Sequence, residues 1–257
     1  MNFINQVAFI TGAAQGLGKA FTEALLKKGA RVCFTDIQGE KGQQVESDFK
    51  GKYGQKNVLF LTCDVSSSQN LKNCFQRAVS TFGGVDIMVN NAGIVDEENW
   101  KNVININLVG ALEGSMLAIE HMRTDKGGKG GKIINIASTA GLTGVFFTPS
   151  YSAAKFGLVG FHRSWASNPY IGQLGLQFGC LCPAFTDTAI LYPKSKSQYD
   201  DDFKKFIGQY GVNKVETVVE AFLMLVESEN CNQDIITVTA QDGIQYHYKE
   251  NLKKSNL

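Results

Sequence analysis

Residues 7–18 read Val-Ala-Phe-Ile-Thr-Gly-Ala-Ala-Gln-Gly-Leu-Gly, an apolar run that leads directly into a glycine-rich turn. The run predicts a buried strand, and the periodicity that starts at Leu17 predicts a helix. Gly12 permits a tight turn, Gly16 lets the backbone approach a diphosphate, and Gly18 lets the helix pack closely on the strand. The N–H groups and positive dipole at the start of a helix favour phosphate. The stretch therefore predicts a dinucleotide-binding turn rather than a purely structural one.

The rest of the chain continues this alternation of short apolar runs and longer amphipathic runs. Strands are predicted at residues 7–11, 31–36, 58–64, 87–92, 132–138, 177–183 and 234–240. Helices are predicted at residues 17–28, 40–53, 67–82, 99–123, 151–167 and 214–228. Such alternation indicates a parallel sheet with helices on both faces. We expect an α/β fold of the doubly wound Rossmann type, with a seven-stranded parallel sheet, in a single domain over residues 1–257.

The composition is that of an ordinary globular protein, with 44% hydrophobic and 19% charged residues among 257. The formal net charge of +1 produces no overall field that would attract nucleic acid or an anionic membrane. The apolar stretch near the N-terminus is too short for a signal sequence or a membrane span, so we expect a cytoplasmic protein. The cysteines lack metal-ligand spacing, so we expect no metal site and mostly reduced core thiols. They are Cys33, Cys63, Cys74, Cys180, Cys182 and Cys231.

Asp36 ends the second predicted strand, 18 residues after Gly18. This offset is close to the roughly 20 residues expected for a carboxylate that binds the ribose of a dinucleotide. The charge would accept a hydrogen bond from a 2′-hydroxyl and repel a 2′-phosphate, and neither Gln15 nor Ile37 is a basic residue that would reverse the preference. The sequence thus favours NAD over NADP, and an N-cap role for Asp36 is the alternative.

Polar and small residues follow the third and fourth predicted strands. Asp64 and Val65 come after one, and Asn91, Ala92 and Gly93 come after the other. All lie at the carboxyl edge of the predicted sheet, where ligands bind in open α/β folds. Ala92 and Gly93 would let a flat ring come close, and Asn91 can brace the neighbouring backbone.

Tyr151 and Lys155 lie four residues apart, and Ser138 ends an apolar run thirteen residues before Tyr151. A spacing of four places the phenol and the ammonium on one face of a helix, where the ammonium would favour the ionised phenol. Ser138 would emerge at the carboxyl end of its strand. The three residues therefore predict a proton-transfer site at the cofactor edge.

The order and spacing of these motifs resemble those of the short-chain dehydrogenase/reductase family over essentially the whole chain. The matching residues are Thr-Gly-x-x-x-Gly-x-Gly at 11–18, Asp36, Asp64, Asn90-Asn91-Ala92-Gly93, Asn107, Ser138, Tyr151, Lys155, Pro183, Thr186 and Thr188. The resemblance implies that Tyr151 takes the hydroxyl proton of an alcohol while the nicotinamide takes the hydride. It also implies that Ser138 orients the hydroxyl, Lys155 holds the ribose, and Asn107 places a proton-relay water or bonds to backbone.

The resemblance and the edge positions together predict the residues that contact the cofactor. They are Gly12, Gln15, Gly16, Leu17, Gly18, Asp36, Ile37, Asp64, Val65, Asn91, Ala92, Gly93, Tyr151, Lys155, Pro183, Phe185, Thr186 and Thr188. One departure from the family is Ala184, which follows Pro183 where glycine is usual; the added methyl group should be tolerated.

The connection over residues 184–211 is long and aromatic, which predicts a substrate lid with some helix of its own. With the adjacent Phe146 and Phe147 it indicates a pocket for a lipophilic secondary alcohol of eicosanoid, steroid or isoprenoid type. Thr148 stands where a family member carries a substrate-contacting glutamine, so the family does not fix the substrate. Predicted substrate contacts are Ser138, Phe146, Phe147, Thr148, Tyr151, Phe185, Leu191, Tyr192, Phe206 and Tyr210. The lid lysines Lys194, Lys196, Lys204 and Lys205 either meet a carboxylate or are solvated surface charges.

The predicted helix at 151–167 carries more apolar residues than one buried face needs, including Phe156, Phe161 and Trp165. In this family such helices form a dimer interface, so we expect a homodimer. Three alternatives to an NAD-dependent alcohol dehydrogenase stay open. They are an NADP-dependent carbonyl reductase, a non-catalytic nucleotide-binding redox sensor, and a structural or storage protein.

Overall fold

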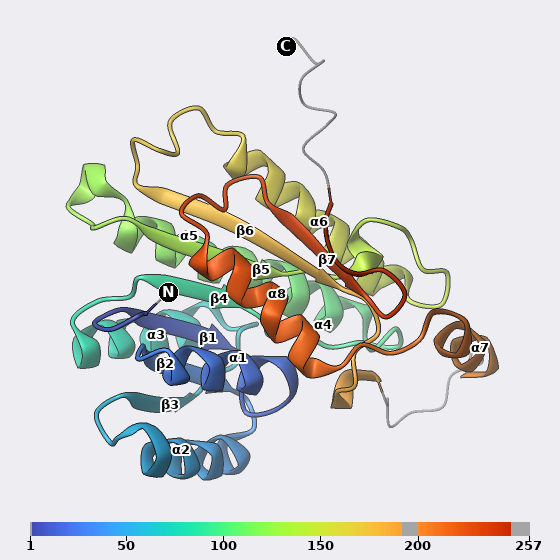
Figure 1. Ribbon diagram of the computed structural model, residues 1–257, viewed down its shortest axis with the longest axis horizontal. Helices are drawn as coiled ribbons and strands as arrows, with labels where there is room; N and C mark the ends of the chain where they lie inside the picture. Colours follow the sequence, from blue (N-terminus) through green and yellow to red (C-terminus); the bar gives the residue numbers. More distant parts are fainter. Residues whose placement is uncertain (1, 192–199, 248–257) are drawn as a thin grey trace.

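The computed structural model describes residues 2–191 and 200–247. Its centre is one sheet with the strand order β3-β2-β1-β4-β5-β6-β7-β8, in which only the β7–β8 pair is antiparallel (Figure 1). The order reverses between β1 and β4, which opens a crevice at the carboxyl ends of these strands. The strands are β1 Val7–Thr11, β2 Arg31–Asp36, β3 Val58–Thr62, β4 Ile87–Asn90, β5 Gly131–Ile136, β6 Leu176–Pro183, β7 Ile235–Thr239 and β8 Gly243–Tyr246.

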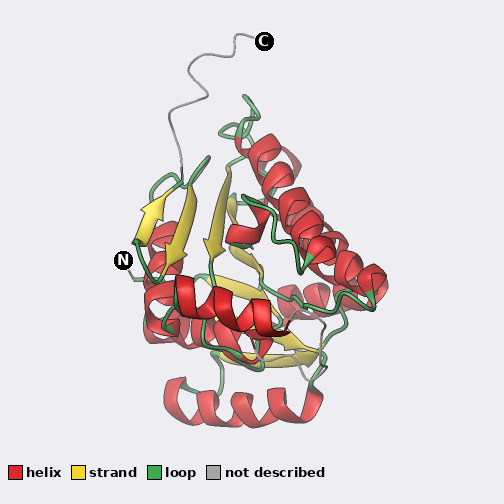
Figure 2. Cartoon of the chain, turned by 90° about the vertical axis from the view of Figure 1, so that its right-hand side faces the viewer, coloured by secondary structure: helices red, strands yellow, loops and turns green. Residues whose placement is uncertain are grey.

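Helices cover both faces of the sheet (Figure 2). The α-helices are α1 Gly16–Lys27, α2 Gly39–Tyr53, α3 Ser68–Phe82, α4 Trp100–Ile104, α5 Ala111–Met122, α6 Pro149–Ala166, α7 Asp200–Tyr210 and α8 Val215–Glu227. A π-helix, η1 Asn105–Gly110, joins α4 to α5. Short 3-10 turns are η2 Thr124–Lys126, η3 Thr139–Gly141 and η4 Ala189–Leu191.

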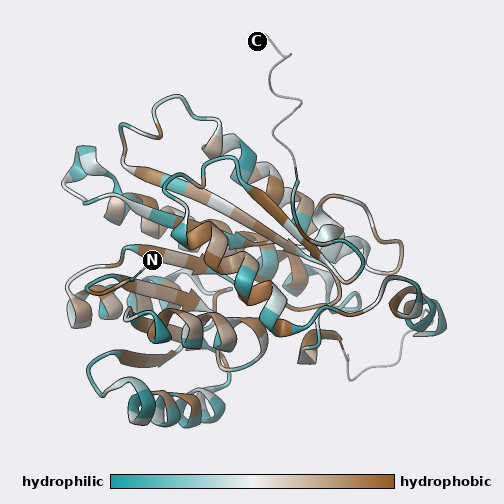
Figure 3. Ribbon diagram, viewed as in Figure 1, coloured by the Kyte–Doolittle hydropathy of each residue, from teal (hydrophilic) through white to brown (hydrophobic). Residues whose placement is uncertain are grey.

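The core forms two layers because central parallel strands are apolar on both faces. On one face α1, α2 and α8 pack on the sheet, and the rings of Phe21 and Phe222 stack with centroids 4.3 Å apart. On the other face α3, α5 and α6 pack, and Trp165 stacks on Phe178 of β6 at 5.5 Å. Figure 3 shows the strands as mainly hydrophobic and α2 as largely hydrophilic on its outer side. All six cysteines are buried and free.

The single-domain α/β fold and the seven parallel strands agree with the prediction, and the structure adds two features. The first is β8, which follows β7 after a turn at residues 240–242 and begins at Gly243, whose φ is +69°. Its four residues are too few for a recognisable alternation. The second is η1, which interrupts the helix predicted at 99–123 and contains Asn107. The expected single α-helix was therefore wrong in its interior, where the hydrogen-bonding pattern widens for six residues.

The long connection has helical structure in its described parts. It contains η4 and α7, and α7 lies beyond the carboxyl ends of the strands (Figure 1). Residues 192–199 lie outside the described residues.

The helical run Trp100–Met122 is long and apolar enough to cross a membrane by length and composition alone. In this fold it packs on the sheet, where Ala118, Ile119 and Met122 are buried in the second core layer. Contacts with α3 and α6 thus explain the buried part of its apolar surface.

Candidate active site

The turn after β1 places three glycines where a side chain would be strained or would collide. Gly12 and Gly16 have φ angles of +65° and +55°, in the left-handed region that favours glycine. A Cβ atom on Gly12 would lie 2.5 Å from the Cα atom of Ala92, and one on Gly18 would lie 2.4 Å from the carbonyl oxygen of Gly12. The turn, the start of α1 and the segment after β4 therefore pack backbone against backbone.

Asn91 ties this turn to the end of β4. Its Nδ2 donates to the carbonyl oxygens of Thr11 at 2.9 Å and Gly12 at 2.8 Å. The hydroxyl oxygen of Thr11 in turn accepts hydrogen bonds from the backbone N–H groups of Asn91 and Ala92, both at 3.1 Å. These four bonds fix the distance between the two sides of the crevice.

Asp36 ends β2 beside the same turn and is buried. Its Oδ2 accepts from the backbone N–H of Ala14 at 3.0 Å, and its Oδ1 accepts from the N–H of Gln38 at 3.0 Å. The N-cap residue of α2 is Gln38, so Asp36 is not the N-cap. A cation lies near this site, although neither residue 15 nor residue 37 is basic. Lys41, in the first turn of α2, places its Nζ 2.5 Å from Oε1 of Gln15.

Ser138 lies two residues after the end of β5, at the carboxyl edge of the sheet. Its Oγ accepts from the backbone N–H of Ala140 at 3.1 Å and donates to the carbonyl oxygen of Pro183 at 3.3 Å. The Ser138 hydroxyl is also close enough to Tyr151 to affect the pKa of that phenol. Tyr151 is the third residue of α6, so the end of β5 and the start of α6 meet at these two hydroxyl groups.

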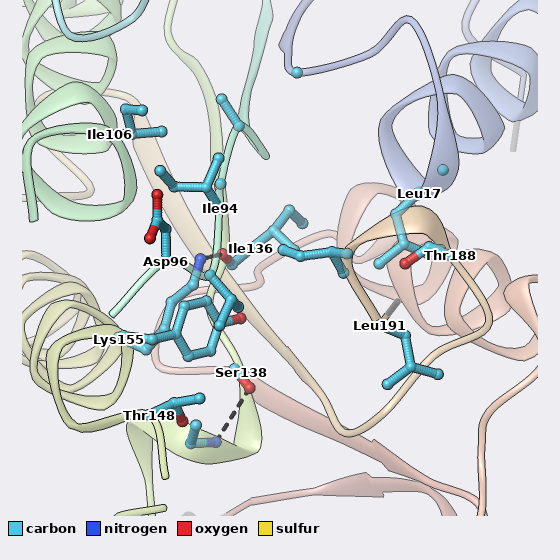
Figure 4. Close-up of a pocket in the computed structure, with 18 of the residues that line it drawn as sticks. Leu17, Ile94, Asp96, Ile106, Ile136, Ser138, Thr148, Lys155, Thr188 and Leu191 are labelled. Carbon is cyan, nitrogen blue, oxygen red and sulfur yellow. Dashed lines mark hydrogen bonds between the residues drawn. The ribbon is translucent and has the colours of Figure 1, made fainter. Parts of the chain in front are cut away.

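Lys155 lies one helical turn after Tyr151 and is buried. Its Nζ donates to the carbonyl oxygen of Ile136 at 2.8 Å and lies 5.5 Å from the centroid of the Tyr151 ring. Figure 4 shows Lys155 and Ser138 among the residues that line the pocket, with the Lys155 amino group near Ile136. A Cβ atom on Gly141 would lie 2.6 Å from the carbonyl oxygen of Lys155, so α6 approaches η3 very closely.

Burial dominates the acid–base properties of this pair. It raises the pKa of Tyr151 to about 12, and the neighbouring Ser138 hydroxyl opposes this rise. Burial also lowers the pKa of the Lys155 ammonium to about 8. The sequence-based expectation that Lys155 lowers the pKa of Tyr151 does not hold for the protein groups alone. The ammonium is bonded to a backbone carbonyl and lies over the ring, and desolvation of the phenolate is the larger effect.

Asn107 is completely buried in η1. Its Oδ1 accepts from the N–H of Ile94 at 3.0 Å, and its Nδ2 donates to the carbonyl oxygen of Ile94 at 2.8 Å. The side chain therefore bonds to backbone, which is one of the two roles expected for Asn107; the other was to place a proton-relay water. A Cβ atom on Gly93 would lie 2.5 Å from Asn107 Oδ1, which explains the glycine there.

A model of the short chain dehydrogenase family matches residues 6–199, which is more than half of the chain. The chain belongs to the short-chain dehydrogenase family.

Curated relatives of this dehydrogenase include 15-hydroxyprostaglandin dehydrogenase [NAD(+)] of Macaca fascicularis, which is 39% identical over 96% of this chain and 95% of its own length. The Homo sapiens protein of that name is 38% identical over the same shares. Among solved structures, a short chain dehydrogenase/reductase of Burkholderia phymatum in complex with NAD has a TM-score of 0.80 at 20% identity, covering 92% of this chain and 90% of its own.

One cavity of about 910 Å³ runs along the carboxyl edge of the dehydrogenase sheet. Most residues predicted to contact cofactor or substrate line it. They are Gly12, Gln15, Gly16, Leu17, Asp36, Ile37, Asp64, Val65, Asn91, Ala92, Gly93, Ser138, Phe146, Phe147, Thr148, Tyr151, Lys155, Pro183, Phe185, Thr186, Thr188 and Leu191.

Five other predicted residues have different positions. Gly18 lies beneath the turn, and Asn107 lies behind Ile94, so neither lines the cavity. Phe206 and Tyr210 belong to α7 and form a layer outside the lining residues. Tyr192 lies outside the described residues, as do Lys194 and Lys196.

Aromatic rings from α7 pack against aromatic rings that line the cavity. Phe203 of α7 lies with its ring centroid 5.7 Å from those of both Phe147 and Phe185. Phe206 lies 5.4 Å from Phe147 and 6.1 Å from Phe146. Edge-to-face contacts of this kind stabilise aromatic clusters beyond simple burial. We call these five residues the aromatic cluster.

Several lining residues were missed by the sequence analysis. The side chains of Ile94, Ile106 and Ile190 form apolar parts of the cavity wall. Phe203 of α7 contributes an aromatic ring to the same wall. Glu97 also lines the cavity and bonds to the first turn of α6. The segment after β4 has no regular periodicity, so only the acidic run at 96–98 could have drawn attention to it.

The bonds of Asn91 give a testable prediction. Asn91→Ala leaves the carbonyl oxygens of Thr11 and Gly12 without their donor, and each such loss costs about 1–3 kcal/mol when the group is buried. The free energy of unfolding, measured in urea, should fall by at least about 1 kcal/mol. Asn73→Ala removes an exposed amide that accepts only from Gln69, and it should change stability by less than about 0.5 kcal/mol. Equal effects of the two substitutions would contradict the bracing role.

Proposed function

We propose that this dehydrogenase uses NAD to oxidise a lipophilic secondary alcohol to the ketone, with Tyr151 as the general base. One observation carries the proposal. Ser138, Tyr151 and Lys155 converge on a cavity whose other end is formed by the glycine turn and Asp36. The names of the curated relatives agree with this reaction class.

The residues present fit a dinucleotide. The turn at Gly12 and Gly16 leaves backbone without side chains at the start of α1, where N–H groups favour a diphosphate. Asp36 and Ile37 would hold the adenosine ribose, with Asp64 and Val65 beside the adenine. Pro183, Phe185, Thr186 and Thr188 would enclose the nicotinamide end opposite Asn91, Ala92, Gly93 and Lys155. NAD, when bound, would supply the acceptor for the hydride.

The preference for NAD over NADP rests on Asp36. A 2′-phosphate would meet its buried carboxylate, which is an unfavourable pairing of like charges. Lys41 follows this carboxylate in the first turn of α2, and its ammonium contacts Gln15 and Gln38 rather than Asp36. In an NADP-dependent carbonyl reductase, the attraction of Lys41 for the 2′-phosphate would have to exceed the repulsion by Asp36.

Tyr151 and Ser138 carry out the proton transfer in this proposal. The substrate hydroxyl donates its proton to the ionised oxygen of Tyr151, and the Ser138 hydroxyl orients the substrate oxygen through a hydrogen bond. Lys155 stays protonated below a pH of about 8, where its ammonium is held by the carbonyl oxygen of Ile136. Asn107 fixes Ile94 in the wall of the same cavity.

The lining residues support an apolar substrate. Phe146, Phe147, Phe185 and Leu191 supply rings and an aliphatic side chain to the cavity that Tyr151 also lines, as expected for an eicosanoid, a steroid or an isoprenoid alcohol. Thr148 also lines the cavity, and its side chain makes no capping bond to α6. Lys204 pairs with Asp201 at 3.6 Å and is mainly exposed, which favours a solvated charge. We further propose that residues 184–211 act as the substrate lid.

The first prediction concerns the base. Tyr151→Phe removes the proton acceptor without changing the ring, so turnover of an alcohol with NAD should fall at least roughly 100-fold. NADH binding, followed by fluorescence, should change less than about twofold. Tyr170→Phe changes an exposed tyrosine and should leave turnover unchanged. Full activity of Tyr151→Phe would exclude the assignment, and NADH binding without turnover of any alcohol by the unmodified protein would favour the redox sensor.

A second prediction concerns pH. The pKa of Tyr151 is raised, so the phenol is mainly protonated at neutral pH and the ionised base becomes more abundant as pH rises. We expect kcat/KM for alcohol oxidation to rise with pH between about pH 6 and pH 9, by at most about tenfold per unit. Ketone reduction uses the protonated phenol and should not rise over this range. A flat profile for oxidation would show that another group accepts the proton.

We also propose a cytoplasmic homodimer. Val109, Met116 and Phe156 are exposed apolar residues on η1, α5 and α6, which pack side by side. A second copy would cover them through an isologous interface. Light scattering at micromolar concentration should give the mass of two chains, and Phe156→Glu should reduce it to one. A monomeric mass for the unmodified protein would refute the dimer.

A further inference from the structure

The backbone N–H groups at the start of α6 need hydrogen-bond acceptors from outside the helix. The first N–H groups of an α-helix have no partners within the helix. Pro149 occupies the first position and has no N–H, which leaves the donors of Ser150 and Tyr151. Thr148 is the N-cap residue, yet its side chain makes no capping bond. The helix that carries Tyr151 therefore depends on a cap from elsewhere in the chain.

Glu97 supplies that cap from more than 50 residues away in the sequence. Its Oε2 accepts from the N–H of Ser150 at 2.9 Å and from the Ser150 hydroxyl at 2.7 Å. Its Oε1 accepts from the N–H of Tyr151 at 3.1 Å. Both oxygens are used, and the negative charge lies at the positive end of an 18-residue helix. The backbone of Tyr151 itself is thus bonded to Glu97.

The segment that carries Glu97 is fixed at its other end as well. Ile94 is held through both backbone groups by Asn107 of η1. Asp96 accepts from the N–H and the side chain of Asn99, just before α4. Residues 94–97 therefore form a short strap from η1 to the first turn of α6, and this strap is part of the cavity wall.

We propose that Glu97 is a positioning residue that holds the hydroxyl of Tyr151 in register with Ser138. The inference rests on the proposed function of Tyr151. Tyr151 is in the first turn of α6, where fraying or a small shift of the helix start would move its side chain directly. A displacement of about 1 Å in an active site can cost about 100-fold in rate. A carboxylate suits this role because it accepts three hydrogen bonds, whereas a carboxamide has a single acceptor oxygen.

The test compares Glu97→Gln with Glu46→Gln. Glu46 is a carboxylate that ties α2 to β3 by accepting from the N–H of Phe60 at 2.9 Å, away from the cavity. Both substitutions should lower the melting temperature by about 2–4 °C, as expected for the loss of one such tie. Only Glu97→Gln should lower kcat, by about 10- to 100-fold, with the dissociation constant of NADH changed less than about twofold.

The pH profile separates positioning from stability. The neighbouring Ser138 hydroxyl opposes the rise in the pKa of Tyr151, so moving the phenol away from Ser138 would raise that pKa further. The rise of kcat/KM for oxidation should therefore move to higher pH in Glu97→Gln and stay in place in Glu46→Gln. Glu97→Asp keeps the negative charge on a shorter side chain. This variant should show the same shift in the pH profile with a smaller loss of kcat. If Glu97→Gln does not fold, Glu97→Asp takes its place in the test.

Two results would overturn the inference. The first is a kcat and pH profile of Glu97→Gln equal to those of Glu46→Gln. The second is unchanged hydrogen exchange of the Ser150 and Tyr151 amides in the Glu97 variants, a measurement that needs no turnover. Failure of the proposed function would be seen differently, because the unmodified protein would then oxidise no alcohol while these amides still lost protection in Glu97→Gln.

Discussion

The close approach of the turn after β1 to the end of β4 is the constraint on which the site depends. Gly12 and Gly18 remove the side chains that would keep the two backbones apart, and Asn91 then bonds across the gap. The reversal of strand order opens the crevice between the same two strands. Asp36 is bonded to the same turn through the N–H of Ala14.

At the opposite end of the cavity, burial disfavours the charged forms of two ionisable side chains. Lys155 and Tyr151 both shift toward their neutral forms because water is excluded, and backbone or hydroxyl oxygens compensate only in part. Perturbed pKa values of this kind are concentrated at functional sites. The two core layers and the ring contacts on either side of the sheet provide the stability against which this local cost is set.

The sequence predicts those parts of the structure that depend on local pattern. The seven parallel strands follow from periodicity, and the cavity lining follows from the rule that strand ends share one edge. Features set by long-range contacts were missed. Glu97 reaches α6 from a loop without periodicity, and Lys41 reaches Gln15 only because α2 folds back over the turn. The widened turn in η1 has no known signal in a run that otherwise reads as one helix. Burial of Tyr151 reverses the direction of its expected pKa shift.

The short strand β8 has a consequence for assembly. Parallel sheets of this type expose their last strand as a template for pairing with another chain, and β8 occupies that edge of β7. With four residues and an opposite direction, β8 itself offers few free backbone groups to a neighbouring sheet. Growth of a continuous intermolecular sheet is thereby discouraged at this side. The proposed dimer would therefore form through side chains on helices rather than through backbone pairing at this edge.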